Sequence, residues 1–566
     1  MLKELGKNIG KYNKLAILTP LLVVCEVAIE VSIPFVISKL IDVGIEGDGG
    51  VSYVVKMGLI MLAMAFASLC FGGLAGRTSA VAGVGFAKNL RNGLFSKVQD
   101  YSFANIDKFS TPSLITRLTT DVTNVQNAFM MMMRIMVRSP VMLICATAFA
   151  IGINRELALI FLVAIPVLGG AIALFSALAY PRFIRMLKKY DLINASVQED
   201  LAGIRVVKTF VRENHESEKF RKSAEELISV AMPLMMLVVY TCIILIIYLG
   251  GTSIIGGSMT VGELTSFLTY VMQIMMSLMM LAMVFVMLLL SKASAQRIVE
   301  VFREQPDIAD PENPVMTAPK DGSIEFKDVT FCYRNSENAA LKDVNLRIES
   351  GETVGVIGGT GSAKSTLVQL IPRLYDATKG EVLVGGRNVK EYDLKVLRDA
   401  VAMVLQKNVL FSGTIKENLL WGNEHATDEE IEQACRTACA YDFVNDFPDK
   451  FDTDLGQGGV NVSGGQKQRL CIARALLKKP LVMILDDSTS AVDTATDRSI
   501  RTALKENLKG MTTIIIAQRI ASVMDADKII VLDNGEITAV GKHEDLLANN
   551  EIYREVYYSQ MNKEEE

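Results

Sequence analysis

Two long stretches without any charged residue dominate the first half of this 566-residue chain. No Asp, Glu, Lys or Arg occurs between Leu227 and Gly262, and none occurs between Leu264 and Ser291. A helix that crosses the hydrocarbon core of a bilayer needs about 20 mainly apolar residues. Only helices and closed barrels satisfy every backbone polar group inside lipid. These stretches therefore predict membrane-spanning helices, not strands of a soluble core.

The same criterion divides the chain into a membrane part and a soluble part. Prolines gather between Pro306 and Pro319, so residues 306–321 are expected to be a linker between an α-helical membrane domain (1–305) and an α/β domain (322–566). The membrane domain is expected to hold six spans: Leu15–Ile41, Val54–Ala80, Ala128–Ile153, Leu157–Tyr180, Ala231–Gly256 and Leu264–Ser291. The net charge of −5 gives no reason to expect a nucleic-acid partner.

The connections between spans predict the orientation in the membrane. Two of them are long and basic, whereas the others are short and poor in Lys and Arg. By the positive-inside rule the long connections and both termini are cytoplasmic. Because the long connections are rich in helix formers, we expect the spans to continue as helices into the cytoplasm, with turns at Lys108–Ser113 and Leu201–Arg205.

A glycine-rich loop follows a strand-like run in the soluble domain. Glycines in a strand-to-helix turn let backbone N–H groups surround phosphates. In this position Lys364 would reach the β- and γ-phosphates of ATP, and Ser365 would ligate Mg²⁺. Ala363 replaces the usual glycine before the lysine, which predicts weakened but not abolished binding. The loop consists of Gly358, Gly359, Thr360, Gly361, Ser362, Ala363, Lys364, Ser365 and Thr366.

Further motifs downstream identify the soluble domain as an α/β P-loop NTPase nucleotide-binding domain. The apolar run Leu481–Leu485 predicts a buried strand that ends at Asp486, where a carboxylate would hold Mg²⁺. Gln406 is placed to contact the metal and a helix of the membrane domain. Tyr333 is placed to stack on adenine. Each of the last two would be an ordinary loop or strand residue if it stood alone.

Taken with Ser463-Gly464-Gly465-Gln466, these motifs make nearly the whole chain resemble an ATP-binding cassette half-transporter of the exporter type. The resemblance implies that two nucleotide-binding domains close head to tail around ATP. Ser463, Gly464, Gly465 and Gln466, opening a helix from Lys467 onward, would then complete the partner's site. Asp493 would belong to the loop that communicates across the interface, and ATP and Mg²⁺ would be the cofactors.

Two positions depart from the pattern of members that hydrolyse ATP. Asp487 follows the Mg²⁺-binding aspartate, where such members have Glu to activate water. Gln518 occupies the place of a histidine that would hold the γ-phosphate. Losing a positioned general base costs about 10²–10⁴-fold in rate. These departures predict a heterodimer, in which this chain binds ATP but hydrolyses it poorly while its intact signature serves the partner's competent site.

The expected substrate is a hydrophobic or amphipathic small molecule of the multidrug type. Glu26 and Glu30 lie one turn apart in the first span and would attract cationic substrates, or they would face a polar interior without a substrate role. Arg134 and Arg138 are expected to reach toward lipid headgroups. Seven methionines in the sixth span suit an adaptable surface, although at helical spacing packing is the more common role. A lipid flippase, a peptide exporter, an importer and a non-transporting nucleotide-gated regulator remain open alternatives.

Overall fold

The computed structural model describes residues 1–155, 231–334, 338–487, 494–507 and 510–561, with a few isolated positions between them (158, 159, 166, 170 and 336). The chain forms two compact units. The first contains Met1–Gln99 and Pro112–Arg303, and the second contains Asp100–Thr111 and Glu304–Glu566.

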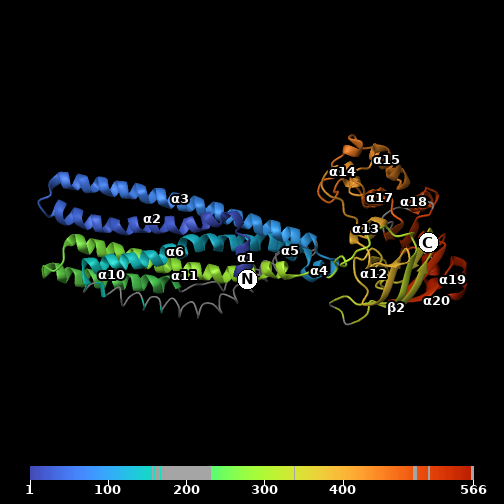
Figure 1. The fold of residues 1–566 in the computed structure, drawn as a ribbon, viewed down its shortest axis with the longest axis horizontal. Helices are drawn as coiled ribbons and strands as arrows, with labels where there is room; N and C mark the ends of the chain where they lie inside the picture. Colours follow the sequence, from blue (N-terminus) through green and yellow to red (C-terminus); the bar gives the residue numbers. More distant parts are fainter. Residues whose placement is uncertain are drawn as a thin grey trace, which may run out of the picture. The chain divides into compact units, whose positions relative to one another are not determined.

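The first unit is helical, and its longest helices run side by side (Figure 1). Among the described residues, four helical stretches are long and apolar enough to cross a membrane: Gly10–Ile45, Gly50–Gln99, Thr111–Ile153 and Val261–Arg303. The helices are α1 (Leu2–Lys7), η1 (Gly10–Tyr12), α2 (Asn13–Lys39), η2 (Leu40–Ile45), α3 (Gly50–Gln99), α5 (Thr111–Thr116), η3 (Arg117–Asp121), α6 (Val122–Ile153), α10 (Ala231–Ile255) and α11 (Val261–Arg303).

These helices agree with five of the expected spans. The first, second, third and sixth spans lie in the four long apolar stretches, and the fifth coincides with α10. The fourth span, Leu157–Tyr180, and the turn at Leu201–Arg205 lie outside the described residues. The 50 residues of α3 are about 75 Å long at 1.5 Å per residue, well beyond a hydrocarbon core of about 30 Å. The helix therefore continues past its span, as the sequence predicts.

The core of the first unit joins α2, α6, α10 and α11. Tyr270 is fully buried there and donates its hydroxyl to the backbone oxygen of Val31 at 3.1 Å. Ser266, one turn earlier on α11, donates to the backbone oxygen of Pro34 at 2.7 Å. These two hydrogen bonds satisfy polar groups that are buried among apolar side chains, and they fix α11 against α2.

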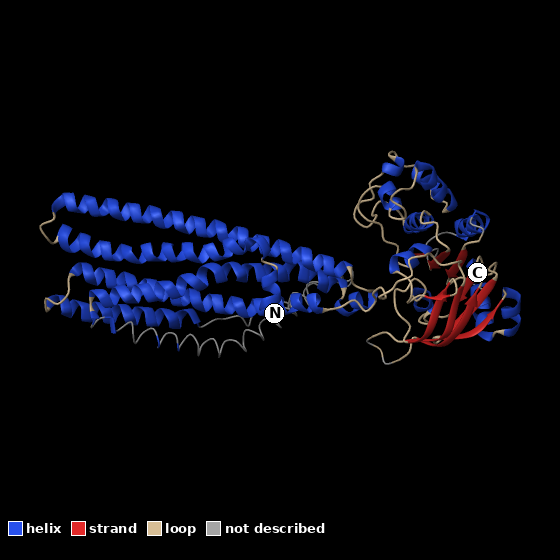
Figure 2. Cartoon of the chain, in the orientation of Figure 1, coloured by secondary structure: helices blue, strands red, loops and turns tan. Residues whose placement is uncertain are grey.

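The second unit contains two sheets with helices around them (Figure 2). The antiparallel sheet has the order β2-β1-β4-β5, built from β1 (Ile324–Phe331), β2 (Leu341–Ile348), β4 (Lys379–Val384) and β5 (Arg387–Asn388). The larger sheet has the order β10-β9-β3-β8-β7-β6 and is parallel except for β10. Its strands are β3 (Thr353–Ile357), β6 (Val401–Val404), β7 (Val482–Asp486), β8 (Thr512–Ile516), β9 (Lys528–Asp533) and β10 (Glu536–Gly541).

The central strands of the larger sheet are buried on both faces. Successive side chains of β7 alternate between two cores: Val482 and Ile484 face the core shared with the antiparallel sheet, and Met483 and Leu485 face the helical side. The surrounding helices are α12 (Lys364–Gln369), α13 (Leu394–Ala400), α14 (Ile415–Leu420), α15 (Asp428–Thr437), α16 (Tyr441–Asn445), η4 (Lys450–Asp452), α17 (Gly464–Leu476), α18 (Thr494–Asn507), η5 (Ile520–Ser522), α19 (His543–Asn549) and α20 (Glu551–Met561).

A short helix from the first long connection also belongs to the second unit. α4 (Phe103–Phe109) is capped at its N-terminus by Ser102 and is followed by Ser110, whose φ of 59° reverses the chain. The sequence predicts a turn at Lys108–Ser113 but not the helix before it. The sequence carries a local signal for this helix, because Ser102 and Asn105 form a reciprocal capping pair.

Candidate nucleotide-binding site

Four parallel strands bring the predicted nucleotide-binding residues together. β3 leads into the glycine-rich loop, β6 leads toward Gln406, β7 ends at Asp486, and β8 leads to Gln518. These strands are neighbours or near neighbours in one parallel sheet. Their carboxyl ends therefore open on the same edge, which is where sheets of this kind bind ligands.

The glycine-rich loop has the backbone geometry that phosphate binding needs. A side chain at Gly358 would place its Cβ 2.0 Å from the backbone oxygen of Leu532, so only glycine fits there. Gly361 has a φ of 85°. Ala363 has φ 71° and ψ 26°, which is the left-handed conformation that its position predicts. An alanine in this region costs about 1–2 kcal/mol relative to a right-handed one.

Lys364 and Ser365 connect the loop to the end of β7. The ammonium of Lys364 donates to the backbone oxygens of Gly358 at 2.9 Å and Gly359 at 2.7 Å. Burial lowers the pKa of Lys364, and the nearby Asp487 and Asp486 carboxylates oppose that shift. Ser365 donates its hydroxyl to Oδ1 of Asp486 at 2.9 Å.

The Ser365 and Asp486 pair fits the expected Mg²⁺ site. Magnesium prefers oxygen ligands and is usually held by one or two protein groups together with substrate phosphates. Within the described residues no group of three or more His, Cys, Asp or Glu side chains is placed to hold a metal. Burial raises the pKa of Asp486, with a further upward effect from Asp487 and a downward effect from the Ser365 hydrogen bond. A bound cation would compensate the negative charge of this buried carboxylate.

Asp487 and the two glutamines meet on one carboxylate oxygen. Oδ2 of Asp487 accepts a hydrogen bond from Gln518 at 2.7 Å and another from Gln406 at 3.2 Å. Asp487 is 7% exposed and has a φ of 46°, an unusual backbone conformation for a residue with a side chain. Asp487, at the position of the catalytic base, and Gln518, at the position of the γ-phosphate contact, are therefore hydrogen-bonded to each other.

Tyr333 lies beside the start of α12, within an aromatic cluster. Its hydroxyl is 2.9 Å from the hydroxyl of Thr366, and its ring meets the ring of Tyr375 edge to face at 5.5 Å. Phe331 completes the cluster, 4.8 Å from Tyr333 between ring centroids. The adenine-stacking role of Tyr333 stays a prediction.

The signature residues cap a helix. Ser463 is the N-cap of α17, which begins at Gly464 and thus earlier than the expected Lys467. The Ser463 hydroxyl accepts from the backbone N–H of Gln466 at 3.3 Å, and the Gln466 side chain accepts from the backbone N–H of Ser463 at 2.8 Å. A helix N-terminus of this kind presents N–H groups and positive potential to an anion. Asp493 lies outside the described residues.

The structure adds a residue to the site that the sequence did not indicate. Gln560 on α20 accepts from the backbone N–H of Ile520 at 2.9 Å and donates to the backbone oxygen of Gln518 at 2.8 Å. The same side-chain amide thus holds both ends of the segment that carries Gln518. No local signal marks this role, because Gln560 and Gln518 are 42 residues apart and meet only through the fold.

A second addition comes from α4. Asp107 accepts a hydrogen bond from the hydroxyl of Tyr375 at 2.7 Å, and Tyr375 packs against Tyr333. Burial raises the pKa of Tyr375, and the Asp107 carboxylate adds to the effect. A continuous series of contacts therefore leads from α4 to the helix that follows the phosphate loop, through Asp107, Tyr375, Tyr333 and Thr366.

The candidate substrate residues in the first span are paired. Arg138 on α6 donates to Glu26 and to Glu30, both at 2.5 Å. The expectation that Arg138 reaches toward lipid headgroups is wrong, because two carboxylates on α2 neutralise it within the helix bundle. The sequence places the acids and the arginine in separate spans, so their pairing depends on how α2 and α6 pack.

Known proteins resemble this chain along its whole length. Residues 16–278 match the family described as ABC transporter transmembrane region, and residues 341–490 match the family described as ABC transporter. An uncharacterized ABC transporter ATP-binding protein of Bacillus subtilis, YfiB, is 37% identical over 98% of this chain and 97% of its own length. An ATP-dependent lipid A-core flippase of Syntrophus aciditrophicus is 32% identical over 84% of this chain and 80% of its own.

A solved structure of a bacterial Atm1-family ABC exporter with ATP bound has the same fold. Its TM-score is 0.80, with 97% of this chain and 99% of that chain covered, at 24% identity. Membrane-spanning helices and a phosphate-binding domain in one chain define a membrane-embedded ATP-driven transporter. The chain belongs to the ABC transporter family: it is a half-transporter with the exporter fold, a multi-pass membrane protein that couples ATP to transport.

Proposed function

We propose that this chain is one half of a heterodimeric exporter whose own nucleotide site binds ATP but hydrolyses it slowly. The observation that carries the proposal is the hydrogen-bonded group formed by Asp487, Gln518 and Gln406. A general base must be within hydrogen-bond reach of the proton that it removes. Here the short Asp487 side chain is engaged by two amides, and neither amide offers a positive charge to the γ-phosphate.

ATP binding does not need the Glu and His side chains that Asp487 and Gln518 replace in this chain. The loop N–H groups and Lys364 would hold the phosphates, and Ser365 and Asp486 would hold Mg²⁺. A bound Mg²⁺ would neutralise charge on the phosphate oxygens. Slow hydrolysis with retained binding suits a site that keeps the two nucleotide-binding domains together through much of the transport cycle.

The signature of this chain would serve the other site. Ser463 caps α17 and the two glycines after it form the start of the helix, as an anion-binding helix N-terminus requires. A partner subunit with Glu and His at the positions of Asp487 and Gln518 would supply the catalytic groups. Such an arrangement makes the complex asymmetric, with hydrolysis mainly at the site that this chain completes through its signature. The intact signature also disfavours a pure nucleotide-gated regulator, which has no evident use for it.

The partner experiment tests this proposal. The ATPase rate of the chain purified alone is expected to be roughly 10²-fold or more below that of the chain co-purified with a half-transporter carrying Glu and His. Matched measurements of ATP binding would establish that the slow chain still holds nucleotide. Rapid turnover by the isolated chain would overturn the heterodimer assignment.

We propose an amphipathic or hydrophobic substrate and the export direction. The apolar, methionine-rich α11 supports this class of substrate, since Met272, Met276, Met280 and Met283 are well exposed on it. A lipid flippase is the second candidate, because a relative at 32% identity is a lipid A-core flippase. Reconstitution with fluorescent lipids in one arm and fluorescent drugs in the other distinguishes the two.

A further inference from the structure

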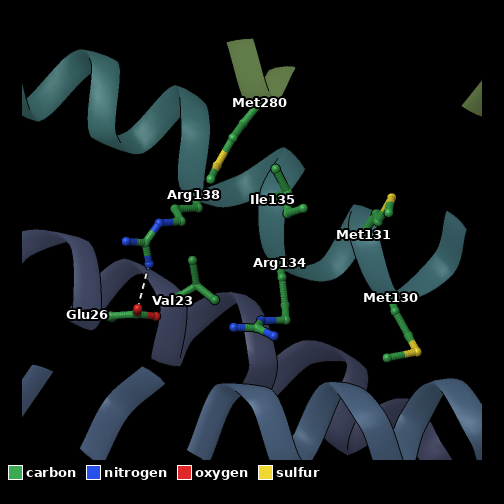
Figure 3. A pocket seen from close by; sticks show the side chains of 8 residues that line it. All are labelled: Val23, Glu26, Met130, Met131, Arg134, Ile135, Arg138 and Met280. Carbon is green, nitrogen blue, oxygen red and sulfur yellow. Dashed lines mark hydrogen bonds and ion pairs between the residues drawn. The ribbon is translucent and has the colours of Figure 1, made fainter. Parts of the chain in front are cut away.

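A pocket of about 380 Å³ lies between α2, α6 and α11 (Figure 3). Most of its lining is apolar and flexible, with three methionines among the side chains. The volume is in the range of small-ligand sites, which are mainly apolar with a few polar groups that fix orientation. The lining residues are Val23, Glu26, Met130, Met131, Arg134, Ile135, Arg138 and Met280.

The charged side chains at this pocket differ in whether they form ion pairs. Arg138 is bonded to Glu26 on one side and to Glu30 on the other, each at 2.5 Å. The other carboxylate oxygen of Glu26 is buried, and Glu26 lies against Gly72 of α3, where an added Cβ would come 3.0 Å from the nearer oxygen. Arg138 thus bonds to both acids, and the other oxygen of Glu26 is buried without a hydrogen-bond partner among the described residues. Of the charged side chains that line the pocket itself, one is an acid, Glu26, and two are cations, Arg134 and Arg138.

Arg134 is the second cation that lines the pocket. It is exposed, and no hydrogen bond or ion pair joins it to another residue in the part of the chain that the structure describes. Its guanidinium extends from α6 toward the side of the pocket where Val23 and Glu26 lie, clear of the Arg138 pair (Figure 3). A cation within a membrane span is costly unless a counter-charge or water compensates it, and it marks a functional site by default.

We propose that this pocket binds an amphiphile with one negatively charged head group, whose acidic oxygens contact Arg134. The planar guanidinium binds carboxylate or phosphate oxygens through paired hydrogen bonds. The hydrocarbon part lies along Met130, Met131 and Met280, whose thioethers adapt to irregular apolar shapes. This inference rests on the proposed transport of amphipathic compounds and narrows the substrate class. Of the two alternatives for Glu26 and Glu30, it favours a polar interior without a substrate role over the attraction of cations.

Two detergents of opposite charge test whether the pocket prefers an anionic or a cationic amphiphile. The full chain in a neutral maltoside detergent is titrated with radiolabelled laurate and with dodecyltrimethylammonium, whose hydrocarbon tails differ by only one carbon. We expect tighter binding of laurate. Arg134→Gln is expected to weaken laurate binding roughly ten-fold or more, because a charge-assisted hydrogen bond is lost, and Arg134→Lys is expected to retain the preference for the anion.

Arg77→Gln is the matched control, since Arg77 is an exposed arginine on the neighbouring helix α3 that does not line the pocket. It is expected to bind laurate as the unmodified chain does. Equal binding of the two detergents by the unmodified chain, or an equal loss in Arg77→Gln, would overturn the assignment. If Arg134→Gln does not fold, the detergent comparison and Arg134→Lys still decide the question.

Competition with phosphatidylglycerol in nanodiscs distinguishes two sources of the anion. Displacement of laurate by phosphatidylglycerol, but not by phosphatidylcholine, supports a bilayer lipid as occupant. Retention of laurate in both nanodiscs supports a single-chain acid. The binding measurement requires neither ATP hydrolysis nor a partner subunit, so its failure would leave the heterodimer proposal intact, and failure of that proposal would leave this one intact.

Discussion

At the scale of single residues, Ala363 is the clearest compromise in the nucleotide site. Its left-handed backbone costs about 1–2 kcal/mol, which glycine would avoid. Glycine also makes the unfolded loop more flexible, which offsets part of that gain. Both effects belong to the folding equilibrium, so we expect Ala363→Gly to raise the free energy of unfolding of the nucleotide-binding domain by up to about 1 kcal/mol. Denaturant unfolding measures the change. The control Gly361→Ala, at a φ of 85°, should lower the free energy of unfolding.

Asp486 predicts a pH dependence of metal-assisted binding. Burial raises its pKa, so on acidification the carboxylate becomes neutral at a higher pH than an ordinary aspartate. Only the ionised form suits Mg²⁺, and Mg²⁺-dependent ATP binding should therefore weaken as the pH falls. Because Asp487 contributes to the upward shift, Asp487→Asn should move the midpoint to lower pH. ATP titrations with and without Mg²⁺ across the acidic range would show this, and an unchanged midpoint would contradict it.

At the scale of elements, α20 holds the segment that carries Gln518. Each of the two Gln560 hydrogen bonds contributes about 0.5–1.5 kcal/mol. We expect Gln560→Ala to increase hydrogen exchange at the Ile520 amide roughly ten-fold. Gln560→Glu keeps an acceptor for that amide and should preserve its protection, although it places a carboxylate against the Gln518 carbonyl. Ser559→Ala is the matched control, because among the described residues the Ser559 hydroxyl bonds only within its own helix. Equal protection of the Ile520 amide in all three variants would contradict this role of the Gln560 side chain.

At the scale of the whole molecule, the asymmetric arrangement predicts opposite results for two substitutions. In the co-purified complex, Ser463→Ala should reduce ATPase activity strongly, because it damages the helix cap that serves the partner's site. Asp487→Glu should raise hydrolysis at this chain's own site only modestly, because Gln518 remains. Steady-state ATPase rates of the two complexes provide the measurement. A complex whose rate is insensitive to Ser463→Ala would contradict the crossed arrangement.

The elements and the chemistry of the motifs follow from local features of the sequence. Uncharged stretches such as Leu264–Ser291 can satisfy their backbone only as helices in lipid, and the loop around Lys364 has a local geometry that its glycines impose. These features depend on neighbours along the chain, so the spans that can be described, the phosphate loop and Asp486 were predictable.

Which side chains contact each other depends on how the elements pack. Three sets of contacts join residues that are far apart in sequence. They are the hydrogen bonds of Asp487 with Gln406 and Gln518, the hydrogen bonds of Gln560 with the Gln518 segment, and the ion pairs of Arg138 with Glu26 and Glu30. Charge compensation inside a bundle depends on which helix faces pack, and residue types within one span cannot specify that. For this reason the sequence left open whether the two acids attract cations or face a polar interior, whereas packing pairs both acids with Arg138 and leaves Arg134 without a partner among the described residues.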